Sequence, residues 1–138
     1  MGDNLRRYRA IKTALKQLYP QTVKGNQARH MNTLAALISG IVGSRRVSLP
    51  EVASKVPDGA KRESRVKRFA RWVQNEQIDA DVYFLPFARD LVAGLAERTV
   101  VLAIDGSEVG RGCMTLLVSV LYRKRALPVA WLVVRGNK

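Results

Sequence analysis

The apolar run Val100–Ile104 is the sequence feature that most constrains the fold, and Asp105, Gly106 and Ser107 follow it directly. A continuous run of β-branched and aliphatic residues is typical of a buried central strand. We therefore expect a strand that presents the Asp105 carboxylate at its end. A carboxylate in such a place is a candidate ligand for Mg²⁺, which binds oxygen ligands. No Asp or Glu follows Glu108, so the rest of the sequence adds no further carboxylate.

The hydropathy pattern changes near residue 98. Before it, apolar residues recur at spacings of three and four, which predicts helices over about 3–19, 26–41, 61–76 and 79–97, with a short helix from Ser48. After it, the segments 100–104, 114–122 and 126–134 have the pattern of strands, and a loop is expected over 106–112. The expected fold class is α+β, with a basic all-helical region over 1–98 and an antiparallel meander over 99–138.

Two prolines bear on these elements. Pro86 lies near enough to the start of the helix expected over 79–97 to be tolerated there or to kink it. Pro128 has no N–H to give to a ladder, so either its nitrogen points away from a partner strand or the third strand begins just after it.

The charge balance points to a polyanionic partner. The 138 residues include 24 Lys and Arg against 11 Asp and Glu, a formal net charge of +13. Such an excess favours nucleic acid as a partner, because neutralising phosphates releases counterions and gives affinity without reading the sequence. The alternative is a basic protein that has no such partner.

Composition excludes several classes of protein. With Cys113 as the one cysteine and His30 as the one histidine, neither an internal disulfide nor a Cys/His zinc site can form. No segment approaches the roughly 18–20 uninterrupted apolar residues of a membrane span, and the polar opening Met1–Asn4 is unlike a signal peptide. We expect a cytoplasmic protein without a membrane partner.

The helix expected over 61–76 is the most basic element. On a helical projection, Val66, Phe69, Ala70 and Val73 gather on one face, and most of the cations cover the other. Glu63 is the only acid between Lys61 and Arg71, whereas a face made only for solubility usually interleaves acids. The candidate phosphate contacts of this helix are Lys61, Arg62, Arg65, Lys67, Arg68 and Arg71. An ordinary solvated face remains the alternative.

Three further residues join the candidate nucleic-acid contacts. Trp72 falls on the basic side of the projection, where its indole either packs on a neighbouring helix or lies against a nucleotide. Arg45 and Arg46 lie in an expected loop beside Gly43 and are placed to add phosphate contacts.

The layout resembles the start of an insertion-sequence DDE transposase. The resemblance rests on the basic helical segment Ser64–Val73, on the run Val101–Ser107, and on the two strands expected after it. It implies a ribonuclease H-like sheet whose first strand carries the first catalytic Asp, matched here by Asp105, and a helical region that binds transposon-end DNA. The family's chemistry uses two Mg²⁺ ions for in-line phosphoryl transfer. A sugar-kinase or actin-like fold begins with a comparable strand but usually has more glycines around its phosphate site.

The sequence also departs from this family. Such transposases carry a second Asp after a later strand and a Glu on a following helix, and nothing after Glu108 can serve as either. We therefore expect an incomplete, truncated catalytic core that is inactive alone, with Asp105 as its single metal ligand. It would act as a homodimer or in association with a full-length transposase. The rival interpretations are a non-catalytic DNA-binding regulator of transposition and a basic RNA-binding protein.

Overall fold

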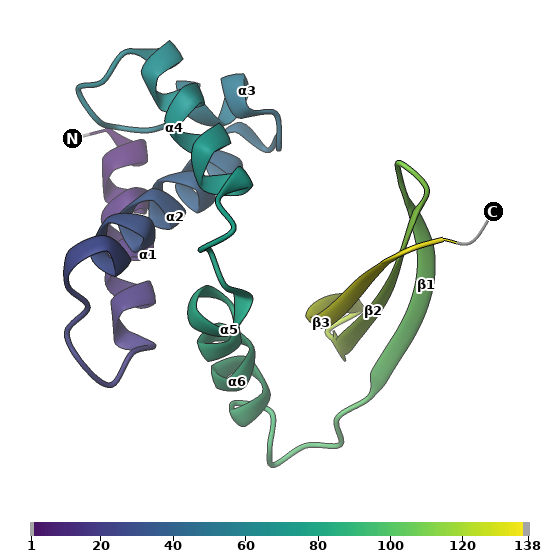
Figure 1. Cartoon of the computed structure of the whole chain (residues 1–138). Coiled ribbons are helices and arrows are strands. Elements are labelled where there is room, and N and C mark those ends of the chain that lie inside the picture. The colour runs from purple at the N-terminus through teal and green to yellow at the C-terminus, as the bar shows by residue number, and fades with distance from the viewer. Residues whose placement is uncertain (1, 137–138) are drawn as a thin grey trace. The chain divides into compact units, whose positions relative to one another are not determined.

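The computed structural model describes residues 2–136 as six helices followed by a three-stranded antiparallel sheet, which confirms the α+β class. The chain divides into two compact units, Met1–Phe87 and Ala88–Lys138, and each is described by itself. Figure 1 labels the elements. They are α1 (Asp3–Gln17), α2 (Gly25–Ser44), α3 (Leu49–Ser54), α4 (Arg62–Gln74), α5 (Ala80–Tyr83), α6 (Leu85–Ala93), β1 (Leu102–Gly110), β2 (Cys113–Tyr122) and β3 (Arg125–Arg135).

The first unit, Met1–Phe87, is called the helical unit below. Helix α2 forms its centre, in contact with α1, α3 and α4 (Figure 1). The core consists of Ala36 and Leu37 of α2, Val52 and Ala53 of α3, Val56 after it, and Phe69 of α4, whose side chain is fully buried. Tyr8, Leu49, Val66 and Trp72 pack around this cluster. The helices are therefore held by one apolar cluster that brings α3 and α4 against α2.

Helix α2 continues to Ser44, three residues beyond its expected end at 41, although Gly40 and Gly43 weaken it locally. A Cβ built on Gly40 would lie 2.5 Å from Cγ1 of Val52 and 2.6 Å from the Val52 carbonyl oxygen. Gly43 similarly leaves room for the side chain of Arg7. The glycines therefore serve close packing, and the helix ends at Arg45, which adopts a left-handed φ of 55°.

The prediction of a single helix over 79–97 is wrong, because the segment forms two helices, α5 and α6, and is helical only to Ala93. Pro86 has no N–H for the carbonyl of Val82, four residues earlier, so that carbonyl lacks its helical partner. The Tyr19 hydroxyl, at the end of α1, donates to it instead. The break at Pro86 thus supplies the acceptor that ties α5 to the rest of the helical unit.

The sheet has the order β1-β2-β3 and confirms the expected antiparallel meander. Two turn residues, Arg123 and Lys124, join β2 to β3, and both have positive φ, 45° and 64°. The ladder shifts register opposite Ser119, which pairs with Pro128 on the outer strand β3. Because β3 begins at Arg125, the expectation of a strand that begins just after Pro128 is wrong. A bulge on an outer strand tolerates a residue without an N–H.

Strand β1 differs from its prediction in two ways. It runs to Gly110, so Asp105 lies within the strand, opposite Leu117, and the loop expected over 106–112 is confined to a turn at Arg111 and Gly112. In the described sheet β1 is an outer strand, and most of its side chains are exposed, whereas a buried central strand was expected. The apolar run alone does not distinguish these cases, because burial depends on what covers the strand.

Candidate nucleic-acid interface

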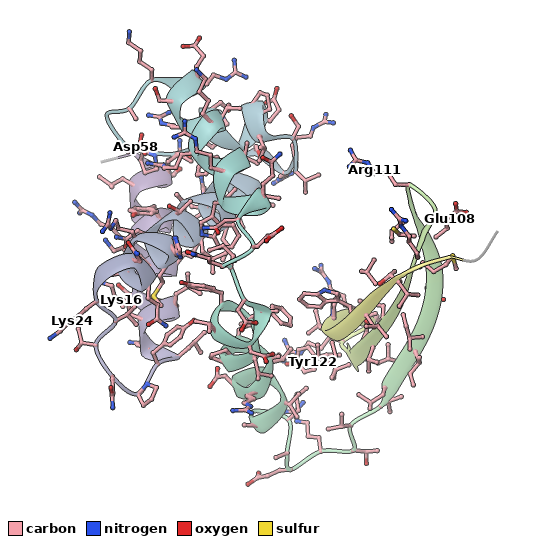
Figure 2. The ribbon with its side chains drawn as sticks, viewed as in Figure 1. Lys16, Lys24, Asp58, Glu108, Arg111 and Tyr122 are labelled. Atoms are coloured by element: carbon pink, nitrogen blue, oxygen red, sulfur yellow. The ribbon has the colours of Figure 1, made fainter. Side chains whose placement is uncertain are left out.

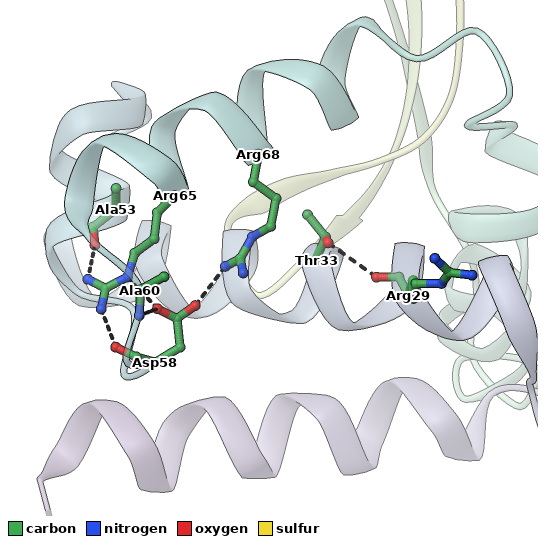
Figure 3. A network of polar contacts seen from close by, with 7 residues as sticks. All are labelled: Arg29, Thr33, Ala53, Asp58, Ala60, Arg65 and Arg68. Atoms are coloured by element: carbon green, nitrogen blue, oxygen red, sulfur yellow. Dashed lines mark hydrogen bonds and ion pairs between the residues drawn. The ribbon is translucent and has the colours of Figure 1, made fainter.

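The polar centre of the helical unit is Asp58, in the turn between α3 and α4. Its Oδ1 accepts from Nε of Arg65 at 2.5 Å, and its Oδ2 accepts from Nη2 of Arg68 at 2.8 Å. Arg65 also donates to the carbonyl oxygen of Asp58 and, from Nη1, to that of Ala53 at 3.0 Å. Figure 3 shows the two arginines reaching from α4 to this one carboxylate. They therefore fasten α4 to the turn before it and to the end of α3.

The electrostatics of Asp58 follow from these contacts. Partial burial works to raise the pKa of its carboxyl, but the hydrogen bonds from Arg65 and Arg68 and the amide of Ala60 outweigh it, so the pKa lies below its usual value. The side chain of Arg65 is only 13% exposed, and that of Arg68 is 41% exposed. Arg65 is thus the least available of the predicted phosphate contacts, and Arg68 is partly available.

The remaining predicted cations of this region lie on the outer surface of the unit. Lys61, Arg62, Lys67 and Arg71 are exposed, and Arg62 donates from Nε to the carbonyl of Pro50 at 3.1 Å. Lys61, Lys67 and Arg71 form no ion pair with any residue in the described range 2–136. Figure 2 shows nitrogen-tipped side chains that point outward from the ribbon around α4. The charges of these three residues are therefore free to meet an anion in solution.

Arg45 and Arg46 follow α2 and are exposed. The left-handed Arg45 turns the chain, and the Ser44 hydroxyl bonds both the N–H and the carbonyl of Arg46 at 3.2 Å. The backbone of this turn is thereby fixed while both guanidinium groups face solvent. Both arginines are therefore exposed, as residues that contact phosphate must be.

Trp72 packs inside the unit, the first of its two expected arrangements. Its Nε1 donates to the carbonyl of His30 on α2 at 3.1 Å, and its ring meets Tyr83 edge to face at 6.3 Å between centroids. Val73, expected on the packing face, is 64% exposed. The packing face of α4 is therefore rotated toward Val66, Phe69 and Trp72, because a large amphipathic indole gains more from partial burial than a valine.

The carboxylates of β1 do not form a metal site. Asp105 and Glu108 are three residues apart within one strand, and successive side chains of a strand alternate, so the two point to opposite faces of the sheet. Glu108 lies near the turn that joins β1 to β2 (Figure 2). Between residues 2 and 136, no three His, Cys, Asp or Glu gather in an arrangement that could hold a metal ion. Asp105 is thus a single exposed carboxylate.

Asp58 and His30 are the residues of this region whose roles the sequence did not reveal. Asp58 lies between Pro57 and Gly59, residues typical of a turn, but only the fold shows that its carboxylate meets two arginines of the following helix. An acid one turn before a basic helix is the signal that was present. His30, on α2, is half-buried and places Nδ1 3.1 Å from the Tyr83 hydroxyl.

Comparison of the chain with known protein families, with curated proteins and with solved structures finds no match. None of the helices in the part of the chain that the structure describes has the length and apolar character needed to cross a membrane.

Proposed function

We propose that the helical unit binds double-stranded DNA through phosphate contacts. The observation that supports the proposal is that the cations around α4 form two groups, one ion-paired inside the unit and one exposed. Arg65 and Arg68 share one carboxylate inside the unit, while Lys61, Lys67 and Arg71 are exposed and unpaired within the described residues. Like charges held side by side repel one another unless an anion lies between them, and DNA phosphates supply that anion. Arg62 and the pair Arg45 and Arg46 extend this surface.

We further propose that the chain is the N-terminal part of a DDE transposase and that its DNA is the transposon end. Two features support this proposal: the basic helical unit precedes an antiparallel meander, and the first strand of that meander carries Asp105. In a ribonuclease H-like sheet, β1 would be the first strand, and Asp105, which lies within it, would take the place of the first catalytic Asp. In that role Asp105 would be the first ligand of Mg²⁺, the ion that assists phosphoryl transfer in such enzymes.

The described residues do not fit a Mg²⁺ site on their own. A hard cation needs several oxygen ligands, and Asp105 has no second carboxylate on its face of the sheet. We therefore propose that this chain neither cleaves nor joins DNA by itself. This mismatch favours a second candidate function, a non-catalytic regulator that occupies transposon ends as a homodimer or together with a full-length transposase.

The salt dependence of DNA binding tests the proposal. The affinity of the full chain for a fluorescent duplex is measured by anisotropy over a range of salt concentrations. The triple variant Lys61→Gln, Lys67→Gln, Arg71→Gln should flatten the slope of log K against log[salt] by about 0.9 for each phosphate that is no longer neutralised. The matched control removes three charges from the β2–β3 turn and the first residue of β3, Arg123→Gln, Lys124→Gln and Arg125→Gln, and should leave the slope unchanged.

Two outcomes would contradict this function. Equal slopes for the wild type and the α4 variant would mean that the cations of α4 are merely solvated. Stronger competition by structured RNA than by duplex DNA at equal salt would favour the RNA-binding interpretation instead.

A further inference from the structure

The groove between α2 and α4 contains a depression of about 230 Å³ with an unusual set of lining residues. Two of them are cations, Arg68 and Arg71, and none is a carboxylate. Hydroxyl and amide groups complete its polar lining. Ser64 and Asn75 come from the α4 side, and Thr33 comes from α2, where its hydroxyl donates to the carbonyl of Arg29 at 3.2 Å. The depression therefore offers hydrogen-bond donors and positive charge, although Arg68 also pairs with Asp58, which lies outside the lining.

The donors form a stripe along one helix. Ser64, Arg68 and Arg71 follow one another at spacings of four and three residues, which places them on one side of α4, and Asn75 directly follows the last residue of the helix. From Ser64 to Arg71 this stripe covers about 10 Å along the helix axis at about 1.5 Å per residue. A nucleic-acid strand repeats about every 3.4 Å along its axis, so the stripe is long enough to follow more than one nucleotide. An isolated ion would use only a small part of it.

Arg68 is held in place before any ligand arrives. One terminal nitrogen pairs with Asp58 at 2.8 Å, and the guanidinium carbon lies 5.2 Å from the centroid of the Phe69 ring. Figure 3 shows Arg68 reaching into the space between α4 and α2, where Thr33 lies. A side chain that is already ordered loses little further rotamer freedom on binding, which favours affinity.

Two aromatic groups line the same depression and have fixed orientations. The Nδ1 of His30 faces the Tyr83 hydroxyl, and the indole of Trp72 is fastened to the His30 carbonyl. Their flat surfaces are suited to the sugar that separates successive phosphates. Charge-assisted donors beside flat apolar groups match a sugar–phosphate chain better than a carboxylate ligand.

We propose that the depression between α2 and α4 is the seat of the sugar–phosphate backbone of duplex DNA, contacted by Arg71, Arg68 and Ser64. The inference rests on the proposed DNA-binding function and adds the place where one strand is held. It separates Arg71, which lines the seat, from Lys67, which is exposed on the same helix but does not line it.

The single histidine of the chain provides a local probe, because His30 lines the depression and no second imidazole overlaps its signals. The imidazole proton signals of the full chain are followed by NMR during titration with a duplex. We expect them to shift with saturation. Arg71→Gln should reduce affinity, lower the salt slope by about 0.9 and abolish the His30 shift at saturation. Lys67→Gln should lower the slope similarly but keep the shift.

The possible results separate this inference from the function beneath it. Saturable DNA binding without a His30 shift, or a shift that survives Arg71→Gln, would overturn the phosphate seat and leave DNA binding intact. A complete lack of DNA binding would overturn both. Inorganic phosphate serves as the second probe: if it moves the His30 signals and the duplex does not, the site takes a free phosphate and the proposal of a DNA contact fails. Unchanged thermal unfolding of Arg71→Gln verifies that the variant is folded.

Discussion

Replacing Asp58 by Asn removes the charge that holds α4 to the turn before it. The carboxylate accepts from Arg65 on one oxygen and from Arg68 on the other, and it also accepts from the Ala60 amide at 3.1 Å. An Asn side chain keeps one acceptor oxygen and places an NH₂ group where the second oxygen was. One of the two arginines then faces a donor instead of an acceptor, while the shape of the side chain is almost unchanged.

The size of the effect follows from the burial of the groups. Removing a hydrogen bond to a charged group costs about 1.5–3 kcal/mol, and the cost is greater when the remaining partner stays buried. Arg65 is 13% exposed and regains little hydration, whereas Arg68 is 41% exposed and regains much of it. We therefore expect a destabilisation of about 2 kcal/mol, in the lower part of that range. For a unit of this size this corresponds to a Tm lowered by about 8–16 °C.

Thermal unfolding of the full chain, followed by far-ultraviolet circular dichroism at several pH values, measures this destabilisation. Because the folded state lowers the pKa of Asp58, its contribution is complete above the ordinary value of 3.8 and disappears as the pH falls through the folded-state pKa. The difference between wild type and Asp58→Asn should therefore be large at pH 7 and vanish in strong acid.

Asp3→Asn is the matched control. Asp3 pairs with Arg6 at 3.4 Å on the surface, where both side chains are more than four-fifths exposed, and exposed pairs contribute little. A Tm for Asp58→Asn no lower than that for Asp3→Asn at pH 7 would refute the argument that the Asp58 contacts hold α4 in place.

Three further predictions concern other parts of the chain. Gly40→Ala should destabilise the protein by about 1–3 kcal/mol in urea unfolding, because its Cβ would collide with Val52, whereas Gly59→Ala, with open space around it, should not. Lys124→Gly should stabilise the β2–β3 hairpin by about 0.5–1 kcal/mol, because glycine adopts the left-handed φ of 64° without strain. Hydrogen exchange of the β2–β3 amides should therefore be slower in the variant, and faster exchange would contradict this. Asp105→Asn should leave the affinity for the duplex unchanged. Neither this variant nor the wild type should nick DNA when Mg²⁺ is added. Mg²⁺-dependent nicking by the wild type would contradict this prediction, because it would show that the catalytic site is complete.

The sequence predicts the elements of this fold better than it predicts their contacts. Helices α1 and α4 and the meander follow from periodicities of 3.6 and 2, which depend only on neighbouring residues. The extension of α2 past Gly40 and the rotation of α4 toward Trp72 depend on residues far away in the sequence, Val52 and His30. Local patterns contain no information about such partners, so these features could not be predicted.

The candidate site divides in the same way. The exposure of Lys67 and Arg71 was predictable because they lie opposite the apolar face of a helix. The burial of Arg65 was not predictable, because its ion pair with Asp58 depends on where the turn places that carboxylate. A carboxylate in a tight turn before a cationic helix is nevertheless a pattern that can be searched for in other sequences.

The hydrogen bond from Tyr19 to Val82 also bears on the order in which the chain folds. It joins residues 63 positions apart, whereas the β2–β3 hairpin closes through two turn residues. The conformational entropy cost of closing a loop increases with its length, and contacts distant in sequence slow folding. The hairpins therefore assemble from neighbours, while the helical unit closes only after α5 has returned to α1. During synthesis that closure waits until Val82 has been made, after helices α1 to α4 are complete.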